Sequence, residues 1–176
     1  MDSSHPFRPK QIPVWGGNVK VTSRDLSLVA VFAALYAVMV YLFFPVSFYV
    51  FQFRVAGILR PGIVRKWVLA VGYGVGVAVG NIFSPFVGPF ELVFMPVMSF
   101  VAGVVGYMAA KPFKNNYFIT GAVVATVIPV SVSWMLNQLF NLPMLATFPY
   151  LLISEQIVCL MGASMFKLIE TRIRWW

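Results

Sequence analysis

Long apolar runs are the feature that most limits how this chain can fold. A transmembrane helix needs about 17 to 25 consecutive apolar residues, because the hydrocarbon core of a bilayer is roughly 30 Å thick. Charged residues make up only 10% of the chain, whereas soluble domains average about 25%. We therefore predict an all-α membrane protein. The runs that are long enough to span are Leu26–Phe44, Trp67–Phe83, Phe90–Ala110, Tyr117–Phe140 and Met144–Phe166.

A sixth apolar segment, Val46–Val64, is long enough only if Gln52 and Arg54 are accepted within it. Irregular backbone is tolerated at membrane depth where protein buries it or where it lines a cavity. We interpret this segment as a loop that enters the membrane, followed by a short helix from about Arg54 to Val64. The expected architecture is a six-helix transmembrane domain over residues 24–176, preceded by a cytoplasmic tail over residues 1–23 without a cleavable signal.

The basic residues indicate how this bundle faces the membrane. With six spans, all the basic connections fall on one side, and the opposite connections carry no charge: Pro45–Phe51, Ser84–Pro89 and Asn141–Pro143. Positive charge favours the cytoplasm, so we expect both termini there. The net charge of +8 then reflects topology rather than nucleic-acid binding, because the basic residues are spread over several connections. The residues that set the topology include Lys10, Lys20, Arg24, Arg60, Arg65, Lys66, Lys111, Lys114, Lys167, Arg172 and Arg174.

Three charged residues remain inside the apolar body: Arg54, Glu91 and Glu155. A charge at helix-centre depth costs roughly 2.5 to 3.5 kcal/mol, so such residues are functional candidates. Glu155 lies 11 residues into its run, about 16 Å deep at 1.5 Å per residue. Two readings remain open: Arg54 pairs with one of the two acids, or these charges contact a ligand.

Other polar residues gather toward the uncharged connections. Asn81 ends the third run, and Trp134, Asn137 and Gln138 recur at helical spacing near the outer end of the fifth. Amides can hold helices together, but this clustering favours an outward-facing binding pocket. The candidate substrate-binding residues are Gln52, Arg54, Asn81, Glu91, Trp134, Asn137, Gln138 and Glu155.

Two runs carry rows of small residues, which allow helix backbones to approach closely. The third run carries Gly72, Gly76 and Gly80, and we expect this row to pack inside the bundle. The first run has an alanine row, which could pack internally or contact another protein. The alanine row consists of Ala30, Ala33, Ala34 and Ala37.

The sequence carries no motif for catalysis or for hydrolysing ATP. It has no P-loop sequence, no H-E-x-x-H, one histidine (His5) and one cysteine (Cys159). We predict no enzyme activity, no metal and no cofactor. Energy for uphill transport would come from a partner. Alternatively, the chain is a stand-alone secondary transporter in which Glu91 or Glu155 relays protons.

Several stretches carry a family resemblance. They are Arg-Asp-Leu at 24–26, the alanine-rich stretch at 29–37, Pro-Val-Ser-Phe at 45–48, Gln-Phe-Arg-Val at 52–55, Asn-Ile-Phe-Ser-Pro at 81–85, Glu-Leu-Val-Phe at 91–94, Leu-Pro at 142–143 and Ser-Glu at 154–155. Together they resemble the substrate-binding S-components of energy-coupling-factor (ECF) transporters, most closely the QueT-type family assigned to queuosine precursors. The resemblance implies a six-helix fold whose ligand pocket opens outward.

The resemblance also implies partners. In S-components, the alanine row of the first helix docks onto a transmembrane coupling protein that carries two ATPases. We accordingly expect a small-molecule substrate, membrane lipid, a coupling protein and two ATPase subunits as partners, and no nucleic acid. One departure bears on the ligand. QueT-type sequences typically have a glutamate soon after the Arg-Val pair, where this chain has Ala56-Gly57-Ile58.

The ligand that the resemblance implies is a 7-deazaguanine or a related small micronutrient. Such a base presents an N–H and an amine on one edge, which a carboxylate can accept, and a flat ring that an indole can stack upon. Glu155 and Trp134 suit these two roles, and Glu91 could meet a cationic aminomethyl substituent. The amides of Gln52, Asn81, Asn137 and Gln138 could satisfy the remaining polar atoms.

Overall fold

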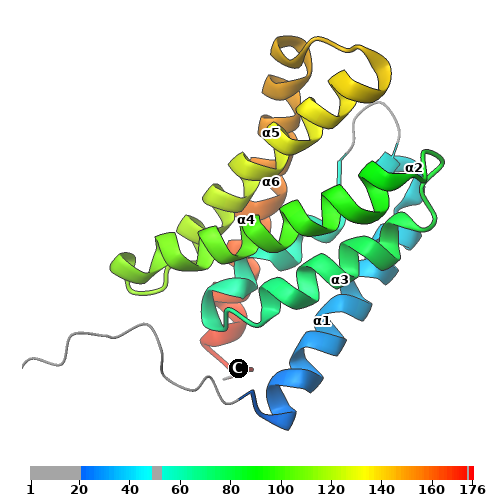
Figure 1. The fold of residues 1–176 in the computed structure, drawn as a ribbon. Coiled ribbons are helices and arrows are strands. Elements are labelled where there is room, and N and C mark those ends of the chain that lie inside the picture. Colours follow the sequence, from blue (N-terminus) through cyan, green and yellow to red (C-terminus); the bar gives the residue numbers. More distant parts are fainter. Residues whose placement is uncertain (1–20, 49–52, 174) are drawn as a thin grey trace, which may run out of the picture.

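The computed structural model describes residues 21–48, 53–173 and 175–176, and in these residues every regular element is helical. The all-α prediction is confirmed. Gln52 lies outside the described residues. Figure 1 shows the bundle, whose elements are α1 (Ser23–Leu42), α2 (Phe44–Phe48), η1 (Val55–Arg65), α3 (Leu69–Asn81), η2 (Phe90–Phe94), α4 (Met95–Ala110), η3 (Lys111–Phe113), α5 (Tyr117–Phe140) and α6 (Met144–Glu170).

Four helical stretches in the described residues are long and apolar enough to cross a membrane: α1, Phe90–Phe113, α5 and α6. The α3 helix has 13 residues, about 20 Å, which is less than a roughly 30 Å hydrocarbon core. The expected span Trp67–Phe83 is therefore only partly α-helical. Hydrogen-bonded turns extend it at both ends, from Leu69 N–H to the Lys66 carbonyl and from Ser84 N–H to the Asn81 carbonyl.

The segment before α3 forms the short helix that the sequence predicts from about Arg54 to Val64. The η1 helix covers Val55–Arg65 and is a 3₁₀-helix of 11 residues. Runs of this type longer than three or four residues are uncommon, and here the surrounding helices bury most of the segment. The contact with α6 is very close, because a Cβ atom added at Gly162 would overlap the Ile58 carbonyl. Packing, rather than local propensity, therefore holds η1 in place.

The glycine row packs inside the bundle, as predicted. A Cβ at Gly72 would lie 2.8 Å from the Val29 carbonyl oxygen, and one at Gly76 would lie 2.8 Å from Cβ of Tyr36. The α1 and α3 helices therefore touch backbone to backbone, which only glycine permits here. The alanine row divides between two faces of α1. Ala33 and Ala37 are buried, whereas Ala30 and Ala34 are exposed.

One end of the bundle is held together by charged residues, and we call it the basic end. Lys66 pairs with Asp25, which also belongs to the capping box at the start of α1. Arg65 pairs with Glu170 and donates a hydrogen bond of 2.9 Å to the Tyr117 hydroxyl. These contacts bring together the starts of α1 and α5, the end of η1 and the end of α6. Figure 1 shows the chain's C-terminal end near the start of α1.

The opposite end carries the connections without charge, and we call it the uncharged end. Ring contacts join its connections: Tyr41 lies 5.2 Å from Phe83, and Phe86 lies 5.3 Å from Phe140 between ring centroids. Asn141 ends α5 in the left-handed conformation, with φ of 53°. In the described residues, the uncharged connections therefore gather at one end of the bundle and the paired basic residues at the other.

Candidate functional site

Three predicted site residues meet at the uncharged end: Arg54, Asn81 and Glu91. We call them the Arg54 cluster. Nη2 of Arg54 donates a hydrogen bond of 3.1 Å to Oδ1 of Asn81 and lies 3.7 Å from Oε2 of Glu91. Nδ2 of Asn81 donates to the Glu91 backbone carbonyl at 2.9 Å. All three side chains are buried. Of the two acids that the sequence left open as partners of Arg54, Glu91 is the one that stands beside it.

Local backbone structure brings these three side chains together. Arg54 immediately precedes η1, Asn81 is the last residue of α3, and Glu91 lies in η2. The η2 segment is a π-helix, a rare form that occurs mostly as single turns and often at functional sites. Sequence periodicity does not predict it, because Phe90–Ala110 reads as one continuous apolar helix.

The Glu91 carboxylate retains unused hydrogen-bonding capacity. Its Oε2 atom is buried and accepts no hydrogen bond from the described residues, since Arg54 stands at ion-pair rather than hydrogen-bond distance. Native structures rarely leave buried polar atoms unsatisfied, and those that remain call for an explanation such as a missing ligand or water. Glu91 is therefore the acceptor in this cluster best placed to receive a donor from outside the chain.

A second buried ion pair lies deeper in the bundle, between Arg60 of η1 and Glu155 of α6. Nη2 of Arg60 also donates to the Tyr36 hydroxyl at 3.3 Å, and its guanidinium lies 5.4 Å from the Tyr73 ring centroid. Six residues of 3₁₀-helix separate Arg60 from Arg54, which corresponds to about 12 Å. Glu155 is buried within α6, but the sequence analysis did not foresee Arg60 as its partner.

Assigning Arg60 to a basic loop was wrong. Its exposed fraction is 0%, and it lies in the middle of η1. The sequence did contain a signal: with two acids in the apolar body and only Arg54 to balance them, one acid lacked a counter-ion. Buried charges are normally paired, so a second base was required. The Arg60 position next to Pro61 and Gly62 reads as a turn, which hid it.

Trp134 of α5 packs against two aromatic residues of η2. Its ring lies 5.9 Å from that of Phe90 and 4.9 Å from that of Phe94. Phe90 and Phe94 belong, like Glu91, to η2, and their rings contact Trp134 of α5. Trp134 is itself 39% exposed, so part of its indole remains open to a further contact.

Asn137 and Gln138 lie in the last turn of α5, as the sequence predicts. Nδ2 of Asn137 donates to the Leu142 carbonyl at 2.9 Å, which ties the end of α5 to the next connection. Gln138 is exposed and lies 3.5 Å from the Asn137 amide oxygen. Among the described residues, no hydrogen bond joins either of them to Arg54, Asn81 or Glu91.

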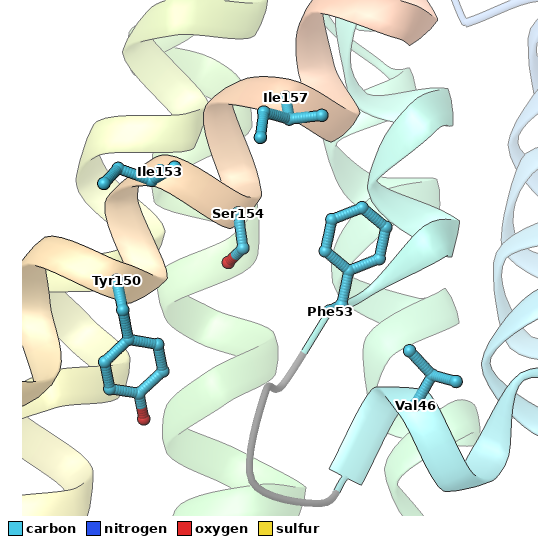
Figure 2. A pocket seen from close by; sticks show the side chains of 6 residues that line it. All are labelled: Val46, Phe53, Tyr150, Ile153, Ser154 and Ile157. Atoms are coloured by element: carbon cyan, nitrogen blue, oxygen red, sulfur yellow. The ribbon is translucent and has the colours of Figure 1, made fainter.

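A groove of about 450 Å³ opens between α6 and the segment leading into η1. Figure 2 shows Val46 and Phe53 on one side, and Tyr150, Ile153, Ser154 and Ile157 of α6 on the other. Phe53 directly precedes Arg54 in the sequence, but Arg54, Asn81 and Glu91 do not line the groove. Its volume falls in the range of small-molecule sites. Phe53 and Tyr150 were not among the predicted site residues, because single aromatic residues in apolar runs give no distinguishing signal.

Comparison with known proteins agrees with the family resemblance. No curated protein and no solved structure matches the chain. A family model described as QueT transporter matches residues 26–171, a stretch that includes all the elements from α1 to α6 except the start of α1. The chain therefore belongs to the QueT transporter family, and it is a multi-pass membrane protein that serves transport rather than catalysis.

Proposed function

We propose that this chain is the substrate-binding S-component of an ATP-driven ECF importer and that it binds a 7-deazaguanine precursor of queuosine, or a related small micronutrient, from outside the cell. The observation that supports this most directly is the Arg54 cluster. It places a buried, incompletely hydrogen-bonded carboxylate at the uncharged end. Intramembrane charges of this kind mark substrate pathways and sites.

The proposal includes a topology of six crossings with both termini in the cytoplasm. The four long helices supply four crossings, and η1 and α3 supply two shorter ones. The asymmetry of charge between the basic end and the uncharged end supports this, since positive charge favours the cytoplasm. The Arg54 cluster then faces outward, where a scavenged nutrient arrives.

In the proposed complex, Glu91 accepts the N–H and amine of the ligand's guanine-like edge, and Asn81 holds the Glu91 backbone in place. Trp134 and its neighbouring phenylalanines offer a face for stacking. The acceptor role falls to Glu91 rather than Glu155, because Glu155 already faces Arg60. Glu155 supports the site by keeping η1, and thus Arg54, in position. Gln52, Asn137 and Gln138 remain candidates for closing the site from the uncharged end.

The proposed partners are a transmembrane coupling protein and two ATPase subunits. The chain has no P-loop of its own, so the energy for import must come from a separate module. Within the alanine row, Ala30 and Ala34 face outward and offer small side chains to a partner helix, whereas Ala33 and Ala37 support α1 from behind.

The alternative, a stand-alone proton-coupled transporter, requires an acid that can take up and release protons. Both intramembrane acids face arginines instead. A buried charge normally needs an opposite partner, and each acid has one here, so neither acid needs a proton-relay function to account for its place inside the bundle. The pairing therefore favours the binding-subunit function.

Uptake by purified components in liposomes distinguishes the two functions. With labelled 7-cyano-7-deazaguanine, we expect uptake only when the coupling protein, both ATPases and internal ATP accompany the chain. A catalytically inactive ATPase pair is the control. Uptake by the chain alone under a proton gradient would contradict the proposal and establish the alternative.

A further inference from the structure

We infer that the Arg54 site selects an electrically neutral ligand over a cationic one, and hence a 7-cyano- over a 7-aminomethyl-7-deazaguanine. The inference rests on the proposed function and narrows its substrate class. The inference follows from the balance of buried charges. The sequence analysis counted this balance incorrectly, because it assigned Arg60 to a loop.

Outside the basic end, the buried charges of the described residues sum to zero. They are two arginines and two glutamates: Arg54 with Glu91, and Arg60 with Glu155. Each acid thus has its own guanidinium, and no acid is left to balance a further cation. The segment 49–52, which reads Tyr-Val-Phe-Gln, contributes no aspartate, glutamate, lysine or arginine.

The two pairs also stand close enough to influence each other. Arg54 immediately precedes η1 and Arg60 lies six residues further along it, about 12 Å at the rise of a 3₁₀-helix, so the two guanidinium charges repel each other across a poorly solvated interior. A cation bound at Glu91 would come close to Arg54 and raise the positive charge at the site. Excess charge in a poorly solvated interior is costly, because it loses its hydration without gaining an opposite partner.

The two candidate ligands differ mainly in this charge. An alkyl amine like that of lysine has a pKa near 10.4, so the aminomethyl form is cationic at neutral pH, whereas the nitrile is neutral. Both share the base edge that Glu91 would accept. The ratio of their dissociation constants therefore measures the effect of ligand charge separately from recognition of the base.

The test is calorimetric titration of the purified full-length chain with both compounds, at pH 7 and constant salt. For the wild type we expect the aminomethyl compound to bind at least about tenfold more weakly, which equals 1.4 kcal/mol. Arg54→Gln leaves Glu91 without its counter-ion and should reverse the preference. Arg54→Gln/Glu91→Gln restores neutrality and should return the preference to the neutral compound.

Glu170→Gln is the matched control, because it removes the same charge from the partly exposed pair at the basic end. It should leave the ratio unchanged. If Arg54→Gln does not fold, Glu91→Gln also tests the dependence of ligand preference on site charge. This variant leaves Arg54 without its counter-ion, so the site carries a net positive charge and the preference for the neutral compound should increase. Equal or tighter binding of the aminomethyl compound by the wild type would overturn this inference while leaving the proposed function intact. Binding of neither compound would overturn both.

Discussion

Arg60 of η1 and Glu155 of α6 form an ion pair inside the bundle although they stand 95 residues apart in the sequence. The pair joins a 3₁₀-helix that has little local stability to the longest helix of the chain. Arg60, which the sequence analysis assigned to a loop, is therefore a buried interior residue. Several expectations depend on this pair and on the close packing around it.

Removing one partner of this pair should destabilise the protein strongly. Glu155→Gln leaves the Arg60 guanidinium buried without a counter-ion, and breaking a buried pair in this way costs about 3 to 5 kcal/mol. Replacing both residues, as in Arg60→Met/Glu155→Leu, should recover most of that loss, because an apolar pair of similar volume carries no charge to desolvate. Denaturant unfolding in mixed micelles measures both effects.

The pair between Arg65 and Glu170 provides the comparison, because its side chains are 18% and 27% exposed. Glu170→Gln should cost no more than about 1 kcal/mol, as expected for a solvated pair. Equal losses for Glu155→Gln and Glu170→Gln would show that the Arg60 pair is not buried as described.

Close packing of η1 against α6 makes Gly162 intolerant of a side chain. A Cβ there would overlap the backbone carbonyl of Ile58 rather than the end of a flexible side chain, so Gly162→Ala should cost at least about 1 to 3 kcal/mol by overpacking. Gly88→Ala is the control, because a Cβ atom there would lie 3.8 Å from the Phe86 carbonyl oxygen, an ordinary van der Waals contact. We expect the free energy of unfolding of that variant to lie within about 0.5 kcal/mol of the wild-type value.

The division of the alanine row predicts two different phenotypes for neighbouring substitutions. Ala33→Leu forces a large side chain between α1 and α3, where a Cβ on Gly76 would already lie 3.0 Å from the Ala33 carbonyl, and should cost about 1 to 3 kcal/mol of stability. Ala34→Leu changes an exposed position and should leave folding and ligand binding intact. In reconstituted liposomes, however, it should reduce uptake driven by the coupling module. Unchanged uptake by Ala34→Leu would place the partner interface elsewhere.

The proposed topology can be tested with single cysteines, since the native Cys159 is buried. Leu142→Cys introduces a thiol at the uncharged end, and Phe113→Cys introduces one after α4; both positions are exposed. A membrane-impermeant maleimide should label Leu142→Cys in intact cells and Phe113→Cys only after permeabilisation. The wild type should remain unlabelled. The reverse pattern would place the Arg54 cluster in the cytoplasm.

Sequence reasoning located most of the fold because hydrophobic length is a strong signal. The bounds predicted for Phe90–Ala110 and Tyr117–Phe140 agree with the helical stretches observed. It also found the helical segment between α2 and α3, although not its 3₁₀ form. That form depends on burial by α6 and other helices, which local propensity does not encode.

The site was predicted less completely than the fold. Arg54, Asn81 and Glu91 meet as their clustering at the uncharged connections suggested. Asn137 was grouped with them by helical spacing, and in the structure its amide donates to the Leu142 carbonyl. Spacing gives the face of a helix but not what that face contacts. The partner of Glu155 was missed for the opposite reason, since Arg60 lies in a segment without regular apolar periodicity.

The central claim is that the chain alone binds a small nutrient at the Arg54 cluster. The most direct measurement is to purify it without partners in mild detergent, identify any retained small molecule by mass spectrometry, and titrate it with 7-cyano-7-deazaguanine by calorimetry. We predict saturable one-to-one binding that Glu91→Gln weakens at least about tenfold, as the loss of a charge-assisted hydrogen bond requires, while the control Glu170→Gln at the basic end binds like the wild type. Absence of binding, or equal affinity in Glu91→Gln, would contradict the account.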